Sequence, residues 1–503
     1  MSNIRVTYTG LISFIGGLIG LVTGSIFSLI ITRTLTPEDF GQWGLIFSVV
    51  SYFPMILSVF SYWATRETAR KLDSGKTSVL STLFFSMIAS IIFIIISFFI
   101  ISQIGSNQIE FNQNNFLLAT VLIPPMFLAG IFSSIALGYK PHVISFSTIS
   151  FGTVQILSAL FLIYFLDMGI PGIILTIMMS YIASALVLFF YVHEKIRTSF
   201  KKEFLKKWLK LFWIPIYPTT YLILTQSSIL IFTVITDSIV GVAYWVASIV
   251  MVSVISSTGL ISRAVYPKLL ENKETHFFQD NLTYLFYFAI LFTSLVISFA
   301  RSGLFLLNPF YEVATPIVMI LSIEGFLVVL INMFQNSLIG IERVDINTQS
   351  TYKDYIKSKL FYVQTLRLIQ TVSYVTILII VLVILTPSVS SEIELLTYWA
   401  SIALITQIPL VTVLTILIKR NFSNPFDIKR IIKFCIVGVV TSTFSYLLTE
   451  QFLTYTPNVF EFIPNLLLFV MFGIGIYCVV TYFIDSKIRI LFNSIIYGIK
   501  NKN

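Results

Sequence analysis

Few ionisable residues lie at membrane depth, where charged chemistry would take place away from bulk water. The candidates are Arg33, Asp237, Glu324, Arg367 and Glu450. A charge at membrane depth costs about 2.5–3.5 kcal/mol on insertion scales and usually faces a cavity or pathway rather than lipid. An arginine fork binds two phosphate oxygens at once and stays charged when desolvated. These residues are therefore the candidates for binding a charged ligand.

Structural roles compete with ligand binding at several of these positions. Asp237 falls in a tight turn between two apolar runs and Glu450 near the end of another, so both favour a place at headgroup level. Arg367 could extend its side chain to the inner membrane surface. Arg33 and Glu324 are the stronger candidates for ligand contact.

Metal and thiol chemistry find little support in the sequence. The two cysteines, Cys435 and Cys478, both fall in apolar stretches, which provides neither a disulfide framework nor a zinc site. The three histidines, His142, His193 and His276, are far apart in short polar connections. We expect no metal, no cofactor and no catalytic residue.

The composition indicates that membrane-spanning segments must position the charged candidates. Hydrophobic residues make up 56% of the 503 positions, and charged residues only 11%, against roughly 25% in soluble domains. A membrane span needs about 20 mostly apolar residues. The connections left over are too short for a catalytic, receptor or nucleotide-binding domain, so function must lie within the membrane.

Fourteen apolar runs are bounded by polar residues. They fall at about 8–32, 41–63, 78–101, 116–138, 143–166, 173–192, 211–235, 239–262, 282–300, 317–340, 361–386, 395–418, 434–453 and 463–484. In hydrocarbon, only helices satisfy every backbone amide within one segment, and barrel strands span only about 10 residues. The sequence predicts an all-α polytopic membrane protein with about fourteen spans. Its first run is too long for a signal-peptide core and is expected to be retained.

Basic residues set the predicted orientation. If the N-terminus is inside, 29 of the 32 lysines and arginines fall in inner connections or tails, and only Arg33, Arg301 and Arg367 lie elsewhere. A strong bias of this kind is typical of the positive-inside rule. We expect a multi-pass protein of the plasma or inner membrane with both termini in the cytoplasm. Because the positive charge follows topology, nucleic acid is not an expected partner.

Two segments have the pattern of amphipathic helices lying on the inner membrane surface. Between the sixth and seventh runs, apolar residues recur at helical spacing opposite lysines: Phe200, Phe204, Leu205, Trp208 and Leu209 against Lys201, Lys202, Lys206, Lys207 and Lys210. After the last run, the pattern returns at Ile488, Leu491, Phe492, Ile495, Ile496 and Ile499. Basic amphipathic helices bind anionic leaflets. A solvated linker is the competing interpretation.

The chain has a weak internal repeat with an offset of about 200 residues. Phe40-Gly41 begins the second run as Val240-Gly241 begins the eighth, and both runs end in basic connections. Parallel repeats build the two lobes of many transporters. We predict an N-terminal six-helix lobe (1–192), a linker helix (193–210), a C-terminal six-helix lobe (211–420), and two accessory helices with an amphipathic tail (421–503). Pro54, Pro124, Pro125, Pro215 and Pro218 are candidate hinges or packing kinks.

The stretch from Arg33 to Gly41 separates into two parts. Thr36 is a good N-cap, Pro37 suits the first helical position, and Glu38 and Asp39 complement the helix dipole in the first turn. This part starts the second span. Arg33 is not needed for the cap, so a ligand role for it remains.

This stretch resembles a family signature. Arg33-Thr34-Leu35-Thr36-Pro37-Glu38-Asp39-Phe40-Gly41 is similar to the Arg-x-Leu-x-Pro-Glu-x-Phe/Tyr-Gly motif of Wzx-type polysaccharide flippases, members of the multidrug/oligosaccharidyl-lipid/polysaccharide (MOP) exporter superfamily. Weaker similarity occurs at 263–268 and at 310–314, where Asn308-Pro309 replaces a glycine common in the family. The whole chain fits the family's fourteen spans.

The resemblance implies an alternating-access flippase with a MATE-like fold and no enzymatic activity. It would carry an isoprenoid-pyrophosphate oligosaccharide to the outer leaflet for surface polysaccharide synthesis. Membrane lipids and other polysaccharide-assembly proteins are the further expected partners, and H⁺ or Na⁺ the possible coupling ions. Arg33 is the first candidate for headgroup contact and Arg367 the second; Arg301, Asp237 and Glu324 complete the substrate-binding candidates.

Two alternatives belong to other functional classes. A multidrug/cation antiporter shares the superfamily fold and would use acidic cavity residues, for which Glu324 is a candidate. A membrane enzyme, such as a glycan polymerase or an acyltransferase, is the second. Polymerases usually have a long outer loop with paired arginines, and acyltransferases an embedded histidine. Neither feature occurs in this sequence.

Overall fold

Helices are the only regular elements in the described part of the chain. The computed structural model describes residues 3–104, 113–262, 276–342, 344, 352–389 and 391–500. Within these residues, 12 helices are long and apolar enough to cross a membrane, or 13 if one bent pair is a single span. The 32-residue helix α1 (Asn3–Thr34) adds a shorter apolar segment, Ile19–Thr34. The predicted all-α multi-pass class is confirmed, and the predicted count of fourteen is approximate.

The helices group into two compact units. The first comprises Met1–Val246 and Arg367–Leu395, and the second Ala247–Leu366 and Leu396–Asn503. This grouping cuts across the predicted lobes, 1–192 and 211–420, because α11, the start of α12 and most of α18 cluster with the N-terminal helices. The two lobes therefore stay a prediction.

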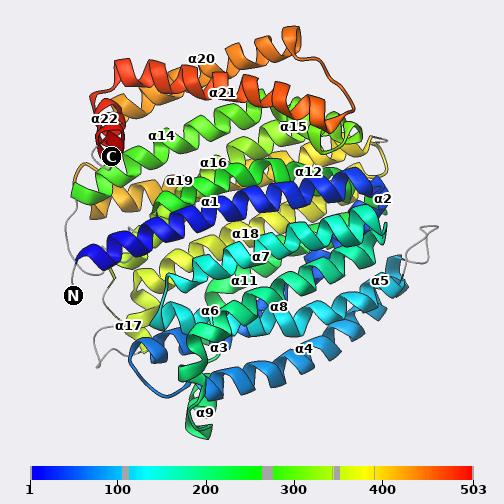
Figure 1. The fold of residues 1–503 in the computed structure, drawn as a ribbon, viewed down its shortest axis with the longest axis vertical. Coiled ribbons are helices and arrows are strands. Elements are labelled where there is room, and N and C mark those ends of the chain that lie inside the picture. The colour runs from blue at the N-terminus through cyan, green and yellow to red at the C-terminus, as the bar shows by residue number, and fades with distance from the viewer. Residues whose placement is uncertain are drawn as a thin grey trace. The chain divides into compact units, whose positions relative to one another are not determined.

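The first unit is built largely from α1 to α11. Its helices are α1, α2 (Pro37–Val50), α3 (Pro54–Ala69), α4 (Gly75–Ile104), α5 (Gln113–Leu118), α6 (Ile123–Tyr139), α7 (Val143–Ala159), α8 (Gly169–Ile196), α9 (Lys202–Lys210), α10 (Trp213–Ile216) and α11 (Thr220–Thr236). In Figure 1, α1, α7 and α8 lie side by side. Small and hydroxylated residues allow this packing: a Cβ on Gly152 would clash with Thr23, and Ser147 and Ser184 share a 2.6 Å hydrogen bond.

The second unit holds the two C-terminal apolar helices that were predicted to be accessory. Its elements are most of α12 (Ile239–Ser256), α14 (His276–Ser298), α15 (Ala300–Leu307), η5 (Pro309–Ala314), α16 (Thr315–Gly340), the start of α18 (Lys359–Leu385), α19 (Glu392–Asn421) after its first turn, α20 (Ile428–Phe452), α21 (Val459–Ile484) and α22 (Ser486–Lys500). Both α20 and α21 pack on α14 (Figure 1). Between α14 and α21, Tyr477 donates to the Tyr287 carbonyl at 3.1 Å, and the Tyr287 and Thr481 hydroxyls lie 3.2 Å apart.

Prolines break two of the predicted spans. The run predicted at 41–63 is divided into α2 and α3, which meet at 44° just before Pro54. Further along the first unit, α10 and α11 are separated by a 3₁₀ turn, Tyr217–Thr219, that contains Pro218. Proline lacks a backbone donor and clashes with the preceding turn, so helices usually end or bend at this residue. These prolines therefore mark real changes of helix direction or type.

The linker between α8 and α11 is docked against the first unit. The predicted amphipathic helix is shorter than 193–210, since α8 continues to Ile196 and α9 begins at Lys202. Trp208 is fully buried, and its Nε1 donates to the buried Glu67 carboxylate at 3.2 Å. Lys207 Nζ lies 3.3 Å from the same oxygen. A tryptophan buried this way ties α9 to α3.

We expect Trp208→Ala to lower the free energy of unfolding by about 3–5 kcal/mol, because the substitution removes a large buried side chain and leaves Glu67 without its indole donor. Chemical denaturation of the purified protein in mild detergent would measure the change. Trp213→Ala, at a position that is 39% exposed, is the matched control and should change stability far less. Equal effects of the two substitutions would contradict a docked Trp208.

Candidate functional site

Arg33 stands at the end of α1, immediately before the loop that leads into α2. It occupies the last turn of α1 and is half-buried. A cation suits the C-terminal end of a helix, where the carbonyls without helical partners carry partial negative charge. A guanidinium here therefore has a favourable local position.

The start of α2 accounts for the rest of the motif. Thr36 is the N-cap: its Oγ1 accepts from the Asp39 backbone N–H at 3.1 Å and donates to the Asp39 carboxylate at 3.0 Å. Pro37 is the first helical residue, and Glu38 and Asp39 occupy the first turn. The cap thus uses Thr36 to Asp39 and does not require Arg33.

Gly41 and Gly44 bring α2 close to α12. A Cβ built on Gly41 would fall on the carbonyl oxygen of Ile239. A Cβ on Gly44 would lie 2.8 Å from Val246 Cγ2 and 3.2 Å from Val242 Cγ1. At Gly41 only glycine permits so close an approach to the neighbouring backbone, whereas a Cβ at Gly44 would meet only the side chains of Val246 and Val242.

Asp237 has a structural role in the turn that precedes α12. It is exposed, has a left-handed backbone with φ of 53°, and caps the C-terminus of α11. Its neighbour Ser238 accepts from the Gly241 N–H at 2.8 Å and donates to the Glu392 carboxylate at 2.6 Å. The turn therefore connects the start of α12 to the start of α19.

Arg367 is the most buried of the candidate cations, with 7% of its surface exposed. It lies in the apolar helix α18, and its guanidinium carbon sits 4.6 Å from the ring centroid of Tyr221 on α11. An arginine over an aromatic face gains up to about 2 kcal/mol when desolvated. Tyr221 thus helps to hold a positive charge within the membrane-spanning helices.

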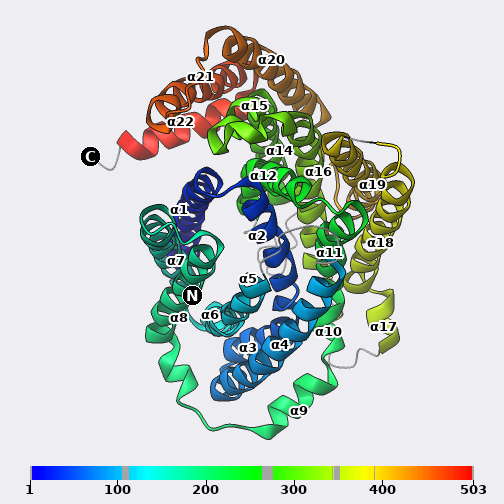
Figure 2. The same ribbon diagram turned by 90° about the vertical axis from the view of Figure 1, so that its right-hand side faces the viewer.

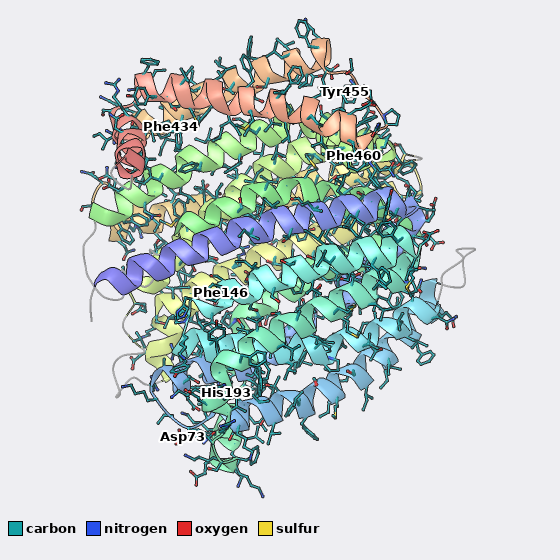
Figure 3. The ribbon with its side chains drawn as sticks, in the orientation of Figure 1. Asp73, Phe146, His193, Phe434, Tyr455 and Phe460 are labelled. Carbon is teal, nitrogen blue, oxygen red and sulfur yellow. The ribbon has the colours of Figure 1, made fainter. Side chains whose placement is uncertain are left out.

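Arg301 is the centre of an ion cluster in the second unit. Its Nε donates to Glu312 at 2.5 Å, its Nη1 donates to Glu450 at 3.0 Å, and its guanidinium lies 5.1 Å from the ring centroid of Tyr455. The hydrogen bonds that Arg301 donates, first to Glu312 and then to Glu450, hold the pKa of its guanidinium above the ordinary value. Figure 3 marks Tyr455 close to one end of α20 and Phe434 near the other. The cluster therefore fastens α20 to α15 and η5.

Glu324 is paired with an amide in the second unit. Gln407 on α19 donates to the Glu324 carboxylate on α16 at 3.1 Å. Gln407 is 8% exposed, and among the described residues its own carbonyl oxygen has no hydrogen-bond partner. An unsatisfied acceptor beside a carboxylate is chemically suited to a cation or a donor group.

Three of the candidates have identified partners within their own unit. Arg301 pairs with Glu312 and Glu450, Glu324 with Gln407, and Arg367 with Tyr221.

Sequence reasoning missed two buried polar pairs. Asn115 on α5 donates to Gln42 on α2 at 3.2 Å, with both side chains at most 6% exposed. Glu67 is 1% exposed, and its carboxylate accepts hydrogen bonds from Trp208 and Lys207. Gln42 and Asn115 are uncharged, and Glu67 sits at the edge of a basic connection, so a search for ionisable residues inside apolar runs passes over all three.

Comparison with known proteins identifies the fold. No family model matches the sequence, and no curated protein matches it. Among solved structures, lipid II flippase MurJ in an inward closed conformation aligns over 95% of this chain and 98% of its own, with a TM-score of 0.61 and 16% identity. An inward-facing multidrug resistance MATE family transporter of the MOP superfamily aligns over 80% and 95%, with a TM-score of 0.57 and 14% identity.

A third similar structure is a MOP superfamily transporter from Pyrococcus furiosus Vc1, described as having a binding pocket of reversed polarity. It aligns over 82% of this chain and 96% of its own, with a TM-score of 0.54 and 15% identity. The chain thus has the fold of MOP superfamily transporters, as the MATE-like prediction expected. The similarity extends over nearly the full length of each of these proteins.

The Arg301 cluster should be energetically coupled. In a double-mutant cycle of Arg301→Ala and Glu450→Ala, we expect a coupling of about 0.5–1 kcal/mol, because both side chains are partly exposed and solvent weakens their attraction. Denaturation of the purified protein in detergent would measure it. Arg301→Ala with Glu461→Ala, an acid outside the cluster, is the control cycle. Additive effects in both cycles would show that Arg301 is free to serve another role.

Proposed function

We propose that this protein is a flippase that carries a lipid-linked oligosaccharide from the inner to the outer leaflet by alternating access. The substrate class is an isoprenoid pyrophosphate bearing a glycan destined for the cell surface. The proposal treats the protein as a transporter rather than an enzyme.

Length-wide similarity to a lipid flippase supports this proposal. The alignment with lipid II flippase MurJ covers 95% of this chain, compared with 80% for the MATE transporter. A phosphorylated sugar cannot cross hydrocarbon unaided, since an isolated ion would cost tens of kcal/mol to desolvate. A flippase offers the headgroup a polar route while the isoprenoid tail stays in lipid.

The observation that carries the proposal is a buried arginine within the spans of a transporter fold. Arg367 is 7% exposed and lies over Tyr221. A half-buried second arginine, Arg33, ends the first apolar helix of the same unit. Guanidinium groups suit pyrophosphate because each can bind two oxygens and neither loses its charge. We assign Arg33 and Arg367 to headgroup recognition.

One observation favours a second candidate function. Glu324 and Gln407 place a carboxylate and an unsatisfied amide oxygen together within α16 and α19, which suits a cation. A multidrug/cation antiporter would use such a pair directly, whereas a flippase could use it for H⁺ or Na⁺ coupling. An antiporter predicts unchanged surface glycan and reduced efflux of cationic compounds when the gene is deleted.

The contact between α2 and α12 fits the closed outer end of an alternating-access cycle. By the predicted topology, Gly41 and Ile239 both lie near the outer membrane surface, on helices that belong to different predicted lobes. Their backbones meet without intervening side chains. Opening to the outside would then require α2 and α12 to separate, and opening to the inside would require them to stay together.

A disulfide between Gly44→Cys and Val246→Cys should stop transport reversibly. A Cβ on Gly44 lies 3.7 Å from Val246 Cβ, within the roughly 3.5–4.5 Å range of disulfides. The pair would be placed in a Cys435→Ala/Cys478→Ala background, oxidised, and assayed for lipid-linked glycan translocation before and after reduction. Each single cysteine variant is the control. Undiminished transport by fully cross-linked protein would refute separation of these helices.

Deleting the gene should leave lipid-linked glycan on the inner leaflet. In the deletion strain, the Arg33→Ala variant should fail to restore export although it inserts normally into the membrane. Removing a charged partner of pyrophosphate should reduce transport at least tenfold, since such hydrogen bonds contribute about 1.5–3 kcal/mol. Surface glycan and inner-leaflet intermediates would be measured, with Arg420→Ala at an exposed helix end as control. Normal surface glycan in a deletion strain without a paralogue would reject the flippase; wild-type export by Arg33→Ala would reject only the headgroup assignment.

A further inference from the structure

The docked linker helix α9 presents a lysine-rich face that the proposed transport cycle does not use. The helix runs from Lys202 to Lys210 and carries four lysines but only one acid, Glu203. It connects α8 to α10, which opens the next span, so both of its ends lie at one membrane surface. Figure 2 shows α9 at the edge of the helices that it joins.

Contacts on the protein side fix how α9 is rotated. Trp208 is fully buried, donates to Glu67, and stacks on Phe204 with ring centroids 6.0 Å apart. The chain just before the helix is held as well: the Lys201 N–H donates to Thr77 Oγ1 at 2.9 Å. Figure 3 marks His193 and Asp73 at this end of the unit. The helix therefore cannot turn its tryptophan toward lipid.

This rotation leaves three lysines on the opposite side. Residues four apart stay on one face of a helix, so Lys202, Lys206 and Lys210 form a stripe, about 180° around the axis from Phe204 and Trp208. All three lysines are exposed. Lys207, by contrast, lies to one side and is engaged by Glu67. The free positive charge of α9 is thus the stripe Lys202, Lys206 and Lys210.

Exposed apolar side chains flank the lysine stripe. Leu209 is 41% exposed, and the residues that follow α9 include Phe212 at 49% and Trp213 at 39%. Apolar groups beside lysines on a helix at a membrane surface are typical of segments that lie at the headgroup boundary. Leu209 and the two aromatic residues match the acyl side of that boundary, and the lysines match the phosphate side.

We propose that the stripe Lys202, Lys206 and Lys210 binds the anionic phospholipid headgroups of the leaflet at which α9 lies, with Trp208 and Glu67 as positioning residues. Because Trp208 is already buried in protein, charge rather than deep insertion provides the attraction. Each lysine near an anionic leaflet should strengthen the interaction about fivefold. The interaction does not depend on which substrate is transported.

Fluorescence of the full-length protein in nanodiscs would test the proposal. The Leu209→Cys variant, in a Cys435→Ala/Cys478→Ala background, would carry an environment-sensitive dye. In nanodiscs of phosphatidylcholine, added phosphatidylglycerol should shift the dye emission to the blue, and high salt should reverse the shift. Inorganic phosphate in solution should produce no such shift, because the expected ligand is a lipid headgroup.

A matched pair of charge variants decides the outcome. Lys202→Gln/Lys206→Gln/Lys210→Gln should abolish the phosphatidylglycerol-dependent shift, whereas Lys419→Gln/Arg420→Gln/Lys429→Gln, which removes the same charge from other exposed positions, should preserve it. A shift that survives loss of the stripe, or that disappears equally in both variants, would overturn the proposal. So would the absence of any shift between the two lipid compositions. Circular dichroism would confirm that both variants retain their helices.

Discussion

The lack of water in hydrocarbon is the constraint on which this structure depends. Without solvent partners, a backbone amide must bond within its own helix and a polar side chain must find a partner in the protein. The described residues follow this rule at several places. Gln42 accepts a hydrogen bond from Asn115, Glu67 accepts one from Trp208, and Gln407 donates one to Glu324. These three pairs therefore act as fixed connections between helices.

Ion pairs hold the accessory helices at both ends. On one side, Asp485 is almost fully buried, lies 3.0 Å from Arg430 and caps α22, while Lys487 pairs with Asp280 on α14. At the other side, Arg301 pairs with Glu450. Between them, the Tyr287 and Tyr477 contacts join α14 to α21. These connections make α14, α20 and α21 a coherent group within the second unit.

Local rules of sequence predicted much of this fold. Apolar length located the spans, the Thr36-Pro37 pair located the start of α2, and Pro54 located a helix break. Other features depend on partners distant in sequence. Trp208 donates a hydrogen bond to Glu67, which is 141 positions away, and Ser238 donates one to Glu392, which is 154 positions away. Arg301 stood out because it did not fit the topology, but only the fold revealed its pairing with Glu312 and Glu450. Periodicity describes which face of a helix is apolar and says nothing about what covers it.

The glycine contact between α2 and α12 has a kinetic consequence. Gly41 and Gly44 have no side chains that would have to withdraw from packing against α12 when the two helices separate. On the α2 side of the contact, separation of the helices therefore requires no rotamer change at these two positions. In the proposed alternating-access cycle, close packing at this place is therefore compatible with a low activation barrier to separation of α2 and α12.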